Sequence, residues 1–306
     1  MLTSADICAV IVSYNPDELS FKCIETILNS AAHTVIVDNR SDEFAVRKLR
    51  QFASARVSLL ENPDNLGVAA ALNQGIRTAV GLGYRWFLFF DQDTEIFATS
   101  IVDLVRVLND CLAELGPKLG PLGSNFHLRH GNGAIDDARL PYSPEHKRWV
   151  PRELVINAGM ALSFESFTAI GPFREDLFVG HVDSEYCLRA QQKGFVVAQM
   201  VSPIAVHRLG MLSRKRAFWA MGARKWVWCY SPLRHYYQVR NLLLLARQYE
   251  GSFPKCIGDL RRGLRRDTWR TLKYEGRFFQ NLSSTVIAWS HGKRGIAGKY
   301  AGRLLS

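Results

Sequence analysis

Two carboxylates separated by one residue, Asp91 and Asp93, are the strongest chemical signal in the sequence. They directly follow the apolar run 86–90, which is too short for a membrane span and predicts a buried strand after the turn residue Gly83. In an open α/β sheet, ligands bind beyond the carboxyl ends of the strands. Proteins usually hold Mg²⁺ or Mn²⁺ with one or two carboxylates and the phosphates of a substrate. The pair therefore predicts a divalent-cation site at the edge of a sheet.

Three earlier apolar runs, at 7–12, 34–37 and 57–60, also predict short buried strands. Each run ends in polar residues, and each is followed by a helical pattern. Strand and helix therefore alternate up to Asp91, which predicts a parallel sheet covered by helices on both faces. No GxGxxG follows any of these strands, so the dinucleotide-binding fingerprint is missing.

The polar residues after these strands belong to loops that converge on one crevice. Tyr14, Asn15, Asp38 and Asn65 are therefore expected to contact a nucleotide. Asn15 is also expected to cap the helix that follows the first strand, with Pro16 at the first helical position. Taken singly, Tyr14 could belong to the core and Asp38 could cap a turn.

Two further residues later in the chain could do chemistry, Asp183 and His207. Asp183 opens a predicted helix at about 184–193, where the helix dipole favours its carboxylate form. An isolated Asp in this setting is more often only a helix cap, and an isolated His is more often packed or exposed than a ligand. Glu185 and Arg189 have the spacing of a helical ion pair, which favours a structural role for Glu185.

The net charge of +11 is distributed unevenly along the 306 residues. Residues 207–306 contain 21 Lys and Arg and 4 Asp and Glu, a net charge of +17, whereas residues 1–206 carry −6. Aromatic residues lie among these cations, which predicts contact with an anionic membrane surface or with nucleic acid. The aromatic residues in question are Trp219, Trp226, Trp228, Tyr230, Tyr236 and Tyr237.

The six cysteines have no CxxC spacing and are expected to be reduced and mostly buried. No basic segment precedes the first apolar run, so we expect no signal peptide. No apolar stretch reaches 18 residues, so we expect no membrane-spanning helix.

Asp91 also permits other interpretations. Haloacid dehalogenase-type phosphatases use DxDxT after a buried strand, and Thr94 fits that motif; however, the motif normally opens the chain, whereas three strands precede it here. A calcium loop is disfavoured because Ile96 occupies the position that requires Gly. A non-enzymatic alternative is single-stranded nucleic acid bound by the basic region.

Several motifs in chain order extend this pattern. They are Val12 Ser13 Tyr14 Asn15, Val37 Asp38 Asn39, Asn65 Leu66 Gly67, Asp91 Gln92 Asp93, Gly171 Pro172 Phe173, Asp183 Ser184 Glu185, Arg189 and His207. Their order resembles the inverting family 2 glycosyltransferases with the GT-A fold. The segment 232–241, PLRHYYQVRN, resembles the bacterial rhamnosyltransferase branch of that family. The resemblance covers roughly residues 7 to 245.

The resemblance implies an α/β fold of the GT-A type, the Rossmann-like architecture of nucleotide-diphospho-sugar transferases. It has a mixed, mainly parallel sheet with flanking helices, here followed by a C-terminal helical basic extension. Residues 1–210 would form the nucleotide-sugar-binding and catalytic domain. Residues 211–306 would form a helical region that contacts the acceptor or the membrane.

The resemblance also implies the substrates. The donor would be dTDP-L-rhamnose or another nucleotide sugar. The acceptor would be a lipid-linked cell-surface glycan, such as an O-antigen of lipopolysaccharide, carried on polyprenyl diphosphate. The enzyme would work in the bacterial cytoplasm at the anionic inner face of the plasma membrane, would not bind nucleic acid, and could form a homo-oligomer.

The site residues carry over by motif position. Contacts to the nucleotide sugar would come from Tyr14, Asn15, Asp38, Asn65 and Asp91, with Tyr14 and Asp38 holding the base. The ligands of Mg²⁺ or Mn²⁺ would be Asp91, Asp93 and His207, and Asp183 would be the general base. One departure is the segment Asn157 Ala158 Gly159, because relatives often carry a hydroxyl residue before this Gly; this affects a minor contact.

The chemistry agrees with these residue types. A departing nucleoside diphosphate carries negative charge that a bound cation can neutralise. The acceptor hydroxyl needs a carboxylate to take its proton as it attacks the anomeric carbon. Attack from the face opposite the leaving group inverts that carbon, and no covalent enzyme intermediate is required.

Overall fold

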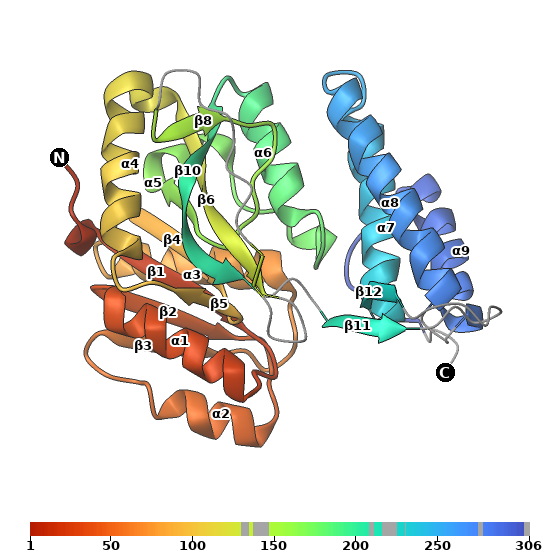
Figure 1. Cartoon of the computed structure of the whole chain (residues 1–306), viewed down its shortest axis with the longest axis horizontal. Coiled ribbons are helices and arrows are strands. Elements are labelled where there is room, and N and C mark those ends of the chain that lie inside the picture. Colours follow the sequence, from red (N-terminus) through yellow and green to blue (C-terminus); the bar gives the residue numbers. More distant parts are fainter. Residues whose placement is uncertain are drawn as a thin grey trace.

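The computed structural model describes residues 1–129, 135–136, 147–207, 211–215, 225–229, 231–274 and 278–302. Its main element is a mixed sheet with the strand order β3-β2-β1-β4-β9-β6-β10-β5, to which β7 and β8 pair at the side (Figure 1). Helices lie on both faces of this sheet, and three C-terminal helices stand beside it. The predicted α/β class and the mixed, mainly parallel sheet are confirmed.

The elements of the first half are η1 (Ser4–Asp6), β1 (Ile7–Ser13), α1 (Glu18–Ser30), β2 (His33–Asp38), α2 (Glu43–Arg50), β3 (Val57–Glu61), α3 (Val68–Gly81), β4 (Trp86–Asp91), β5 (Thr94–Ile96), α4 (Ser100–Leu115), η2 (Gly116–Lys118) and β6 (Leu119–Arg129). Those of the second half are β7 (Ile135–Asp136), β8 (Trp149–Pro151), β9 (Met160–Ser163), α5 (Phe164–Ile170), η3 (Glu175–Leu177), α6 (Val182–Gln192), β10 (Val196–His207), β11 (Met211–Lys215), β12 (Lys225–Cys229), α7 (Pro232–Tyr249), α8 (Pro254–Tyr274) and α9 (Phe278–Arg294).

The first four strands are parallel, and their register aligns the polar residues at their ends. Ser13 pairs with Asp38 across β1 and β2, and Val12 pairs with Asp91 across β1 and β4. Their carboxyl ends therefore meet at one edge of the sheet, as the alternation of strands and helices predicts. β9 runs antiparallel to β4, which makes the sheet mixed.

The short strand β5 explains how residues far apart in sequence meet. It begins directly after Asp93 and pairs antiparallel with the end of β10, so that Thr94 lies opposite His207. Thr94 Oγ1 and His207 Nδ1 are 3.1 Å apart and share a hydrogen bond. This pairing brings the end of β10 to the acidic end of β4.

Two hydrophobic layers hold the sheet. One contains buried residues of α3 and α6, such as Leu72 and Leu188, together with the far end of α7. The other contains residues of α1 and α4, such as Ile24 and Leu104. The central strands contribute to both layers because alternate side chains point to opposite faces.

One local prediction was wrong. Helix α1 begins at Glu18, and its cap is Asp17, whose carboxylate accepts from Ser20 N, rather than Asn15. Pro16 therefore precedes the helix and is not its first residue.

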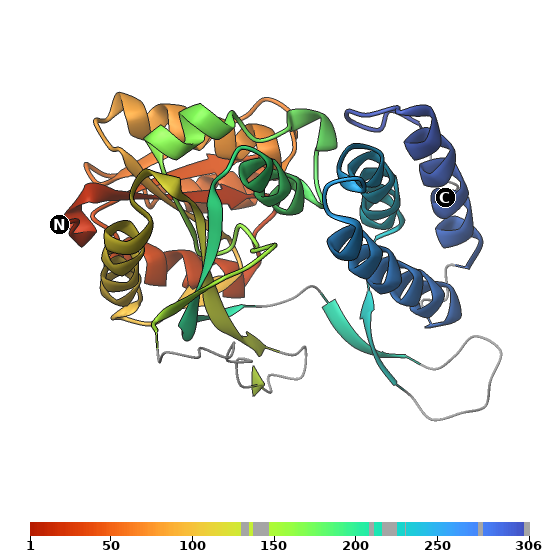
Figure 2. The same cartoon turned by 90° about the horizontal axis from the view of Figure 1, so that it is seen from above.

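The C-terminal helices α7, α8 and α9 pack against one another beside the main sheet (Figure 2). The strands β11 and β12 form a separate antiparallel hairpin. Within the described parts of the chain, no helix is both long and apolar enough to cross a bilayer. Trp219 and Tyr230 lie outside the described residues, and the side chains of β11 and β12 are likewise not described.

Tyr236 and Tyr237 do not face a membrane, contrary to the expectation for the basic aromatic region. Both are about 1% exposed, and Tyr237 stacks on Phe178 with 5.0 Å between ring centroids. Tyr237 thus packs α7 against Phe178, whereas Tyr236 Oη lies 2.7 Å from His291 Nδ1 on α9. The exposed aromatic residues of the C-terminal region are instead Trp269, Phe279 and Trp289.

The cysteines whose side chains are described are buried and form no disulfide bonds, as expected. These are Cys8, Cys23, Cys111, Cys187 and Cys256.

Candidate active site

A cavity of about 440 Å³ opens at the strand ends and is called here the strand-tip cavity. From the sheet side it is lined by the loops after β1, β2, β3 and β4 and by the end of β10. From the other side it is lined by Phe178, Val179 and the first turns of α7. Of the residues predicted to bind substrate or metal, Tyr14, Asn65, Asp91, Asp93 and His207 line it.

Asp91, Asp93 and His207 form a group of potential metal ligands. Each offers one ligand atom, and these atoms lie within 4.8 Å of one another. His207 Nδ1 is 3.7 Å from Asp93 Oδ1. Two carboxylates and one imidazole suit Mn²⁺, and the carboxylates with substrate phosphates suit Mg²⁺. The residues present therefore fit a divalent cation.

Two side chains that carried no predicted role in the site orient this group. Asn157 Nδ2 donates to Asp91 Oδ1 at 2.8 Å, so the segment that departs from the family pattern contacts the acidic motif directly. Gln92 Oε1 accepts from Tyr14 N at 2.8 Å, and Gln92 Nε2 donates to Tyr14 O at 3.2 Å. Gln92 thereby fixes the backbone that carries the exposed Tyr14 ring. Its position between the two acids was the only sequence signal for this role.

Asp38 and Asn15 are not among the residues that line the cavity. Asp38 is 1% exposed, and its carboxylate accepts from Ser41 N at 2.9 Å and from the Ser41 hydroxyl. Asn15 Oδ1 accepts from Asp42 N at 2.9 Å. Both residues tie the loops after β1 and β2 together, so in this structure they support the cavity rim.

The loop before α3 closes another side of the cavity. Asn65 Oδ1 accepts from Gly67 N at 3.0 Å, and Asn39 Nδ2 donates to Gly67 O at 3.0 Å. Gly67 has φ +88°, and a Cβ there would lie 2.6 Å from Phe178 O. Only glycine therefore allows this loop to approach the wall at Phe178 so closely. Asn39 lines the cavity and adds to the predicted set of contacts.

Asp183 lies in the first turn of α6, a few residues after the wall formed by Phe178 and Val179, and is not part of the cavity lining. Burial raises the pKa of its carboxyl to about 6. A hydrogen bond from Ser184 N opposes this rise, and the negative charge of Asp91 adds to it. A carboxylate with a pKa close to neutral is suited to accept a proton near pH 7.

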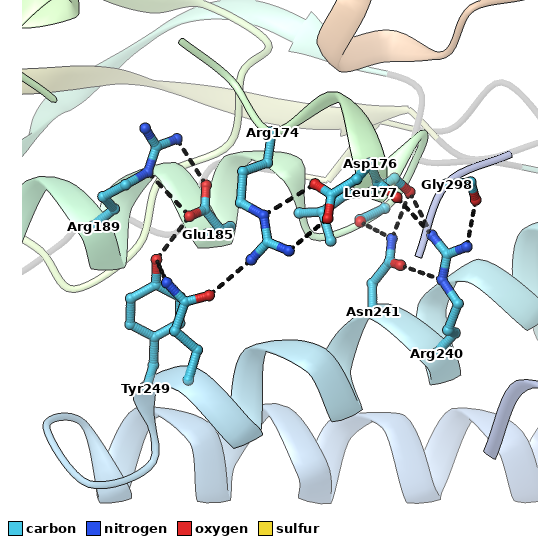
Figure 3. A network of polar contacts seen from close by, with 11 residues as sticks. Arg174, Asp176, Leu177, Glu185, Arg189, Arg240, Asn241, Tyr249 and Gly298 are labelled. Carbon is cyan, nitrogen blue, oxygen red and sulfur yellow. Dashed lines mark hydrogen bonds and ion pairs between the residues drawn. The ribbon is translucent and has the colours of Figure 1, made fainter. Parts of the chain in front are cut away.

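Helix α7 holds the segment before Asp183 through buried polar contacts (Figure 3). Asn241 Nδ2 lies 2.8 to 2.9 Å from the carbonyl oxygens of Leu177, Val179 and Gly180, and donates to them. Arg240 donates to the carbonyls of Asp176 and Leu177, at 3.2 and 3.1 Å. Both side chains are fully buried. The wall between the cavity and Asp183 is thus fixed from a helix about 60 residues further along the chain.

A second set of contacts fixes α6 itself. Glu185 is fully buried and forms a two-pronged ion pair with Arg189 at 3.0 and 2.9 Å. Tyr249 Oη, from the end of α7, donates to Glu185 Oε1 at 2.7 Å (Figure 3). The structural role predicted for Glu185 is therefore confirmed, and its link to Tyr249 is an additional contact.

Comparison with known structures supports the fold. With GalNAc-T7, solved with UDP, GalNAc and Mn²⁺, the TM-score is 0.55 at 14% identity, over 67% of this chain and 44% of that one. With residues 1–349 of S. aureus TarS, solved with UDP-GlcNAc, it is 0.55 at 12% identity, over 95% of this chain and 81% of that one. This chain thus spans less than half of GalNAc-T7 but most of that TarS fragment.

Comparison with known sequences covers nearly the whole chain. A protein of Shigella flexneri named dTDP-rhamnosyl transferase RfbF is 28% identical over 304 residues, which are 96% of this chain and 98% of the relative. The model of the family described as glycosyl transferase family 2 matches residues 8–164, which carry β1 to β4, their polar ends and Asn157. With that match over half of its length, the chain belongs to glycosyl transferase family 2.

Proposed function

We propose that this protein transfers L-rhamnose from dTDP-L-rhamnose to a hydroxyl of a glycan, with inversion at the anomeric carbon. The observation that carries the proposal is a cavity with a cation-binding group of Asp91, Asp93 and His207 beside a separate carboxylate, Asp183, whose pKa is raised toward neutrality. The Shigella relative, similar over its whole length, supports rhamnose as the sugar.

The donor nucleotide occupies the strand-tip cavity in this proposal. Tyr14 is about half exposed there and can stack on the base, while Asn65 and Asn39 lie at the rim. Asp38 and Asn15 contribute by holding the loops; a direct contact of Asp38 with the base requires its Ser41 hydrogen bonds to open. Asp91 is close enough to the metal ligands to share the metal or to reach the ribose.

The metal ligands in the proposal are Asp91, Asp93 and His207, and the ion is Mg²⁺ or Mn²⁺. When bound, such an ion supplies positive charge against the diphosphate that leaves. The hydrogen bond from Asn157 holds one Asp91 oxygen in place. His207 Nδ1, which lies 3.7 Å from Asp93 Oδ1, also shares a hydrogen bond with Thr94 Oγ1.

Asp183 acts as the general base. The acceptor oxygen forms a bond to the anomeric carbon from the face opposite the diphosphate, the bond from that carbon to the diphosphate oxygen breaks, and Asp183 takes the hydroxyl proton. The carboxylate form is required, so kcat rises with pH through the pKa of about 6. A cation held by Asp91 removes one cause of the raised pKa, so the midpoint is expected at or below pH 6.

The acceptor in this proposal is carried on a polyprenyl diphosphate at an anionic membrane surface. Support comes from a set of exposed apolar residues on α8 and α9, called here the apolar stripe: Trp269, Phe279, Leu282, Val286 and Trp289. The four members on α9 follow one face of the helix, and four of the five residues are 55% to 75% exposed. Arg261 and Arg265 of α8 line a common pocket with Trp269 and Trp289, and cations beside exposed apolar residues suit a helix lying on anionic lipid.

The test is turnover of a panel of nucleotide sugars with Mg²⁺ or Mn²⁺, with and without EDTA. We expect release of dTDP from dTDP-L-rhamnose that requires the metal, and a product whose anomeric configuration, read by NMR, is opposite to that of the donor. Equal turnover of all donors would refute rhamnose specificity. Absence of any donor turnover, together with polynucleotide binding that weakens steeply with salt, would favour the nucleic-acid alternative. Membership of family 2 does not support the phosphatase alternative for Asp91.

A further inference from the structure

A second cavity, of about 550 Å³, is lined by residues from the start of α6 and from the helices α7 and α8, and is called here the α7–α8 cavity. Its volume is within the range of small-molecule sites. Its polar lining includes Glu153, His181, His235, Gln238, Asp259 and Asp267. None of these residues has a role in the proposed binding of the donor.

The two cavities share walls. In the segment before α6, Phe178 and Val179 line the strand-tip cavity, whereas His181 lines the α7–α8 cavity. In α7, Tyr237 lines the strand-tip cavity and the next residue, Gln238, lines the α7–α8 cavity. Asp183 follows His181 by two residues. Asp183 itself lines neither cavity, but the segment that leads to it borders both.

His181 has the features expected of a residue that hydrogen-bonds to a ligand. Its Nε2 is buried and has no hydrogen-bond partner among the described residues. A buried polar nitrogen without a partner costs free energy, which a bound hydroxyl would recover. Burial also lowers the pKa of His181 to about 4, so the imidazole is neutral at pH 7 and can donate or accept one hydrogen bond. Its backbone has φ +59°, a strained conformation for a non-glycine residue.

The chemistry of the lining favours a neutral sugar over a phosphate. Besides two neutral histidines and Gln238, it has three carboxylates and one cation, Arg152, which donates to Gln199 at 2.8 Å. Two of the carboxylates, Asp259 and Asp267, form ion pairs with arginines of α8. Within the described residues, the one group of side chains that could hold a cation is in the strand-tip cavity. A phosphate in the α7–α8 cavity would face more carboxylates than cations in the lining, which disfavours it. Carboxylates, amides and imidazoles hydrogen-bond well to sugar hydroxyls.

We propose that the α7–α8 cavity binds the uncharged acceptor sugar whose hydroxyl is activated by Asp183, an inference that rests on the proposed transferase function. His181 Nε2 hydrogen-bonds to one hydroxyl of this sugar. Helix α8 lines the cavity with Asp259 and Gly263, while Trp269 on the same helix belongs to the apolar stripe. An acceptor can therefore have its lipid in the membrane and its sugar in the cavity.

The experiment fills the cavity and measures sugar binding directly. A Cβ added at Gly263 has no atom within 4 Å, so Gly263→Trp puts an indole into the cavity without a backbone clash. Gly258→Trp is the matched control on α8, because Gly258 is not part of the lining and its added Cβ makes only an ordinary contact with Arg262. The probes are the methyl glycosides of N-acetylglucosamine, galactose and L-rhamnose, observed by saturation-transfer NMR with the full chain saturated with dTDP.

We expect at least one neutral glycoside to bind the wild type and the Gly258→Trp variant, and to lose its signal in Gly263→Trp. His181→Asn, which tolerates the left-handed backbone, should weaken that glycoside about tenfold. The inference is wrong if no neutral glycoside binds the wild type. It is also wrong if Gly263→Trp and His181→Asn both bind the glycoside as well as the wild type does. Turnover of dTDP-L-rhamnose by the wild type is measured separately, and its absence would refute the proposed function rather than the cavity assignment.

Discussion

The strand ends of the N-terminal sheet and the C-terminal helices contribute to the site in different ways. Asp91 and Asp93 stand where a strand ends, and their place follows from local rules and from parallel pairing. The wall before Asp183 is instead held by Asn241 and Arg240, which come from a helix outside the matched family region. The first region supplies charge and ligands, and the second supplies position. Substitutions in the first region should therefore lower the rate of transfer directly, whereas those in the second should lower stability and displace the site.

The largest effect is expected from removing a charge in the catalytic region. Asp183→Asn and Asp93→Asn should each lower the rate of transfer by about 10³-fold, because one removes the proton acceptor and the other a metal ligand. Asp103→Asn, at an exposed ion pair on α4, is the control and should retain activity. Rates are measured as dTDP release and as transfer. Near wild-type transfer by Asp183→Asn would exclude it as the base.

The next largest effect tests the C-terminal region as a positioning element. Asn241→Leu removes the donor of three carbonyls, so the free energy of unfolding should fall by about 3 kcal/mol, as measured by urea denaturation. Transfer should also slow, because Gly180 and the residues after it lose their support. Arg247→Leu, at an exposed position on the same helix, should leave stability almost unchanged. Equal stability of the two variants would show that α7 does not hold this wall.

A smaller effect separates catalysis from stability at Asp183. Its pKa of about 6 exceeds the ordinary value of 3.8, so the folded protein binds this proton more tightly than the unfolded chain. The associated stability is present below pH 3.8 and is lost as pH rises to 6. Asp183→Asn should therefore raise the free energy of unfolding by about 1–3 kcal/mol at pH 8 and leave it unchanged near pH 4. A destabilised variant at pH 8 would contradict the raised pKa.

The smallest effect concerns the membrane. Removing two members of the apolar stripe, with Phe279→Ser and Trp289→Ser, should weaken sedimentation with phosphatidylglycerol vesicles about tenfold, because less apolar area enters the bilayer interface. Phe44→Ser is the control, since Phe44 is 60% exposed on α2, outside the stripe. Deleting α8 and α9 is a poorer test because α9 packs on α7, which holds the active-site wall. If Phe44→Ser weakens sedimentation with vesicles as much as the double variant does, the stripe has no specific role in membrane binding.

Much of the catalytic half could be predicted because its strands and site residues follow from short sequence patterns. Short apolar runs form strands, the polar residues after them share an edge, and this is where Asp91 and Asp93 lie. The roles of the loop residues were harder to predict from the sequence. Asp38 is buried because its carboxylate binds Ser41 of its own loop. Asn15 does not cap α1 because its side chain accepts from Asp42 in the neighbouring loop, whose approach depends on the register of β1 and β2.

The sequence alone determined the alternation of strands and helices, the acidic end of β4 and the family to which these belong, because all of them are encoded in short spacings. The family resemblance implied that His207 and Asp93 share a metal, but only the tertiary structure shows how they meet, through the pairing of β5 with β10. The same holds for Tyr236 and Tyr237, which pack inside while Phe279 and Trp289 stay outside. The physical reason is that burial and proximity depend on contacts between distant segments, which no local pattern contains.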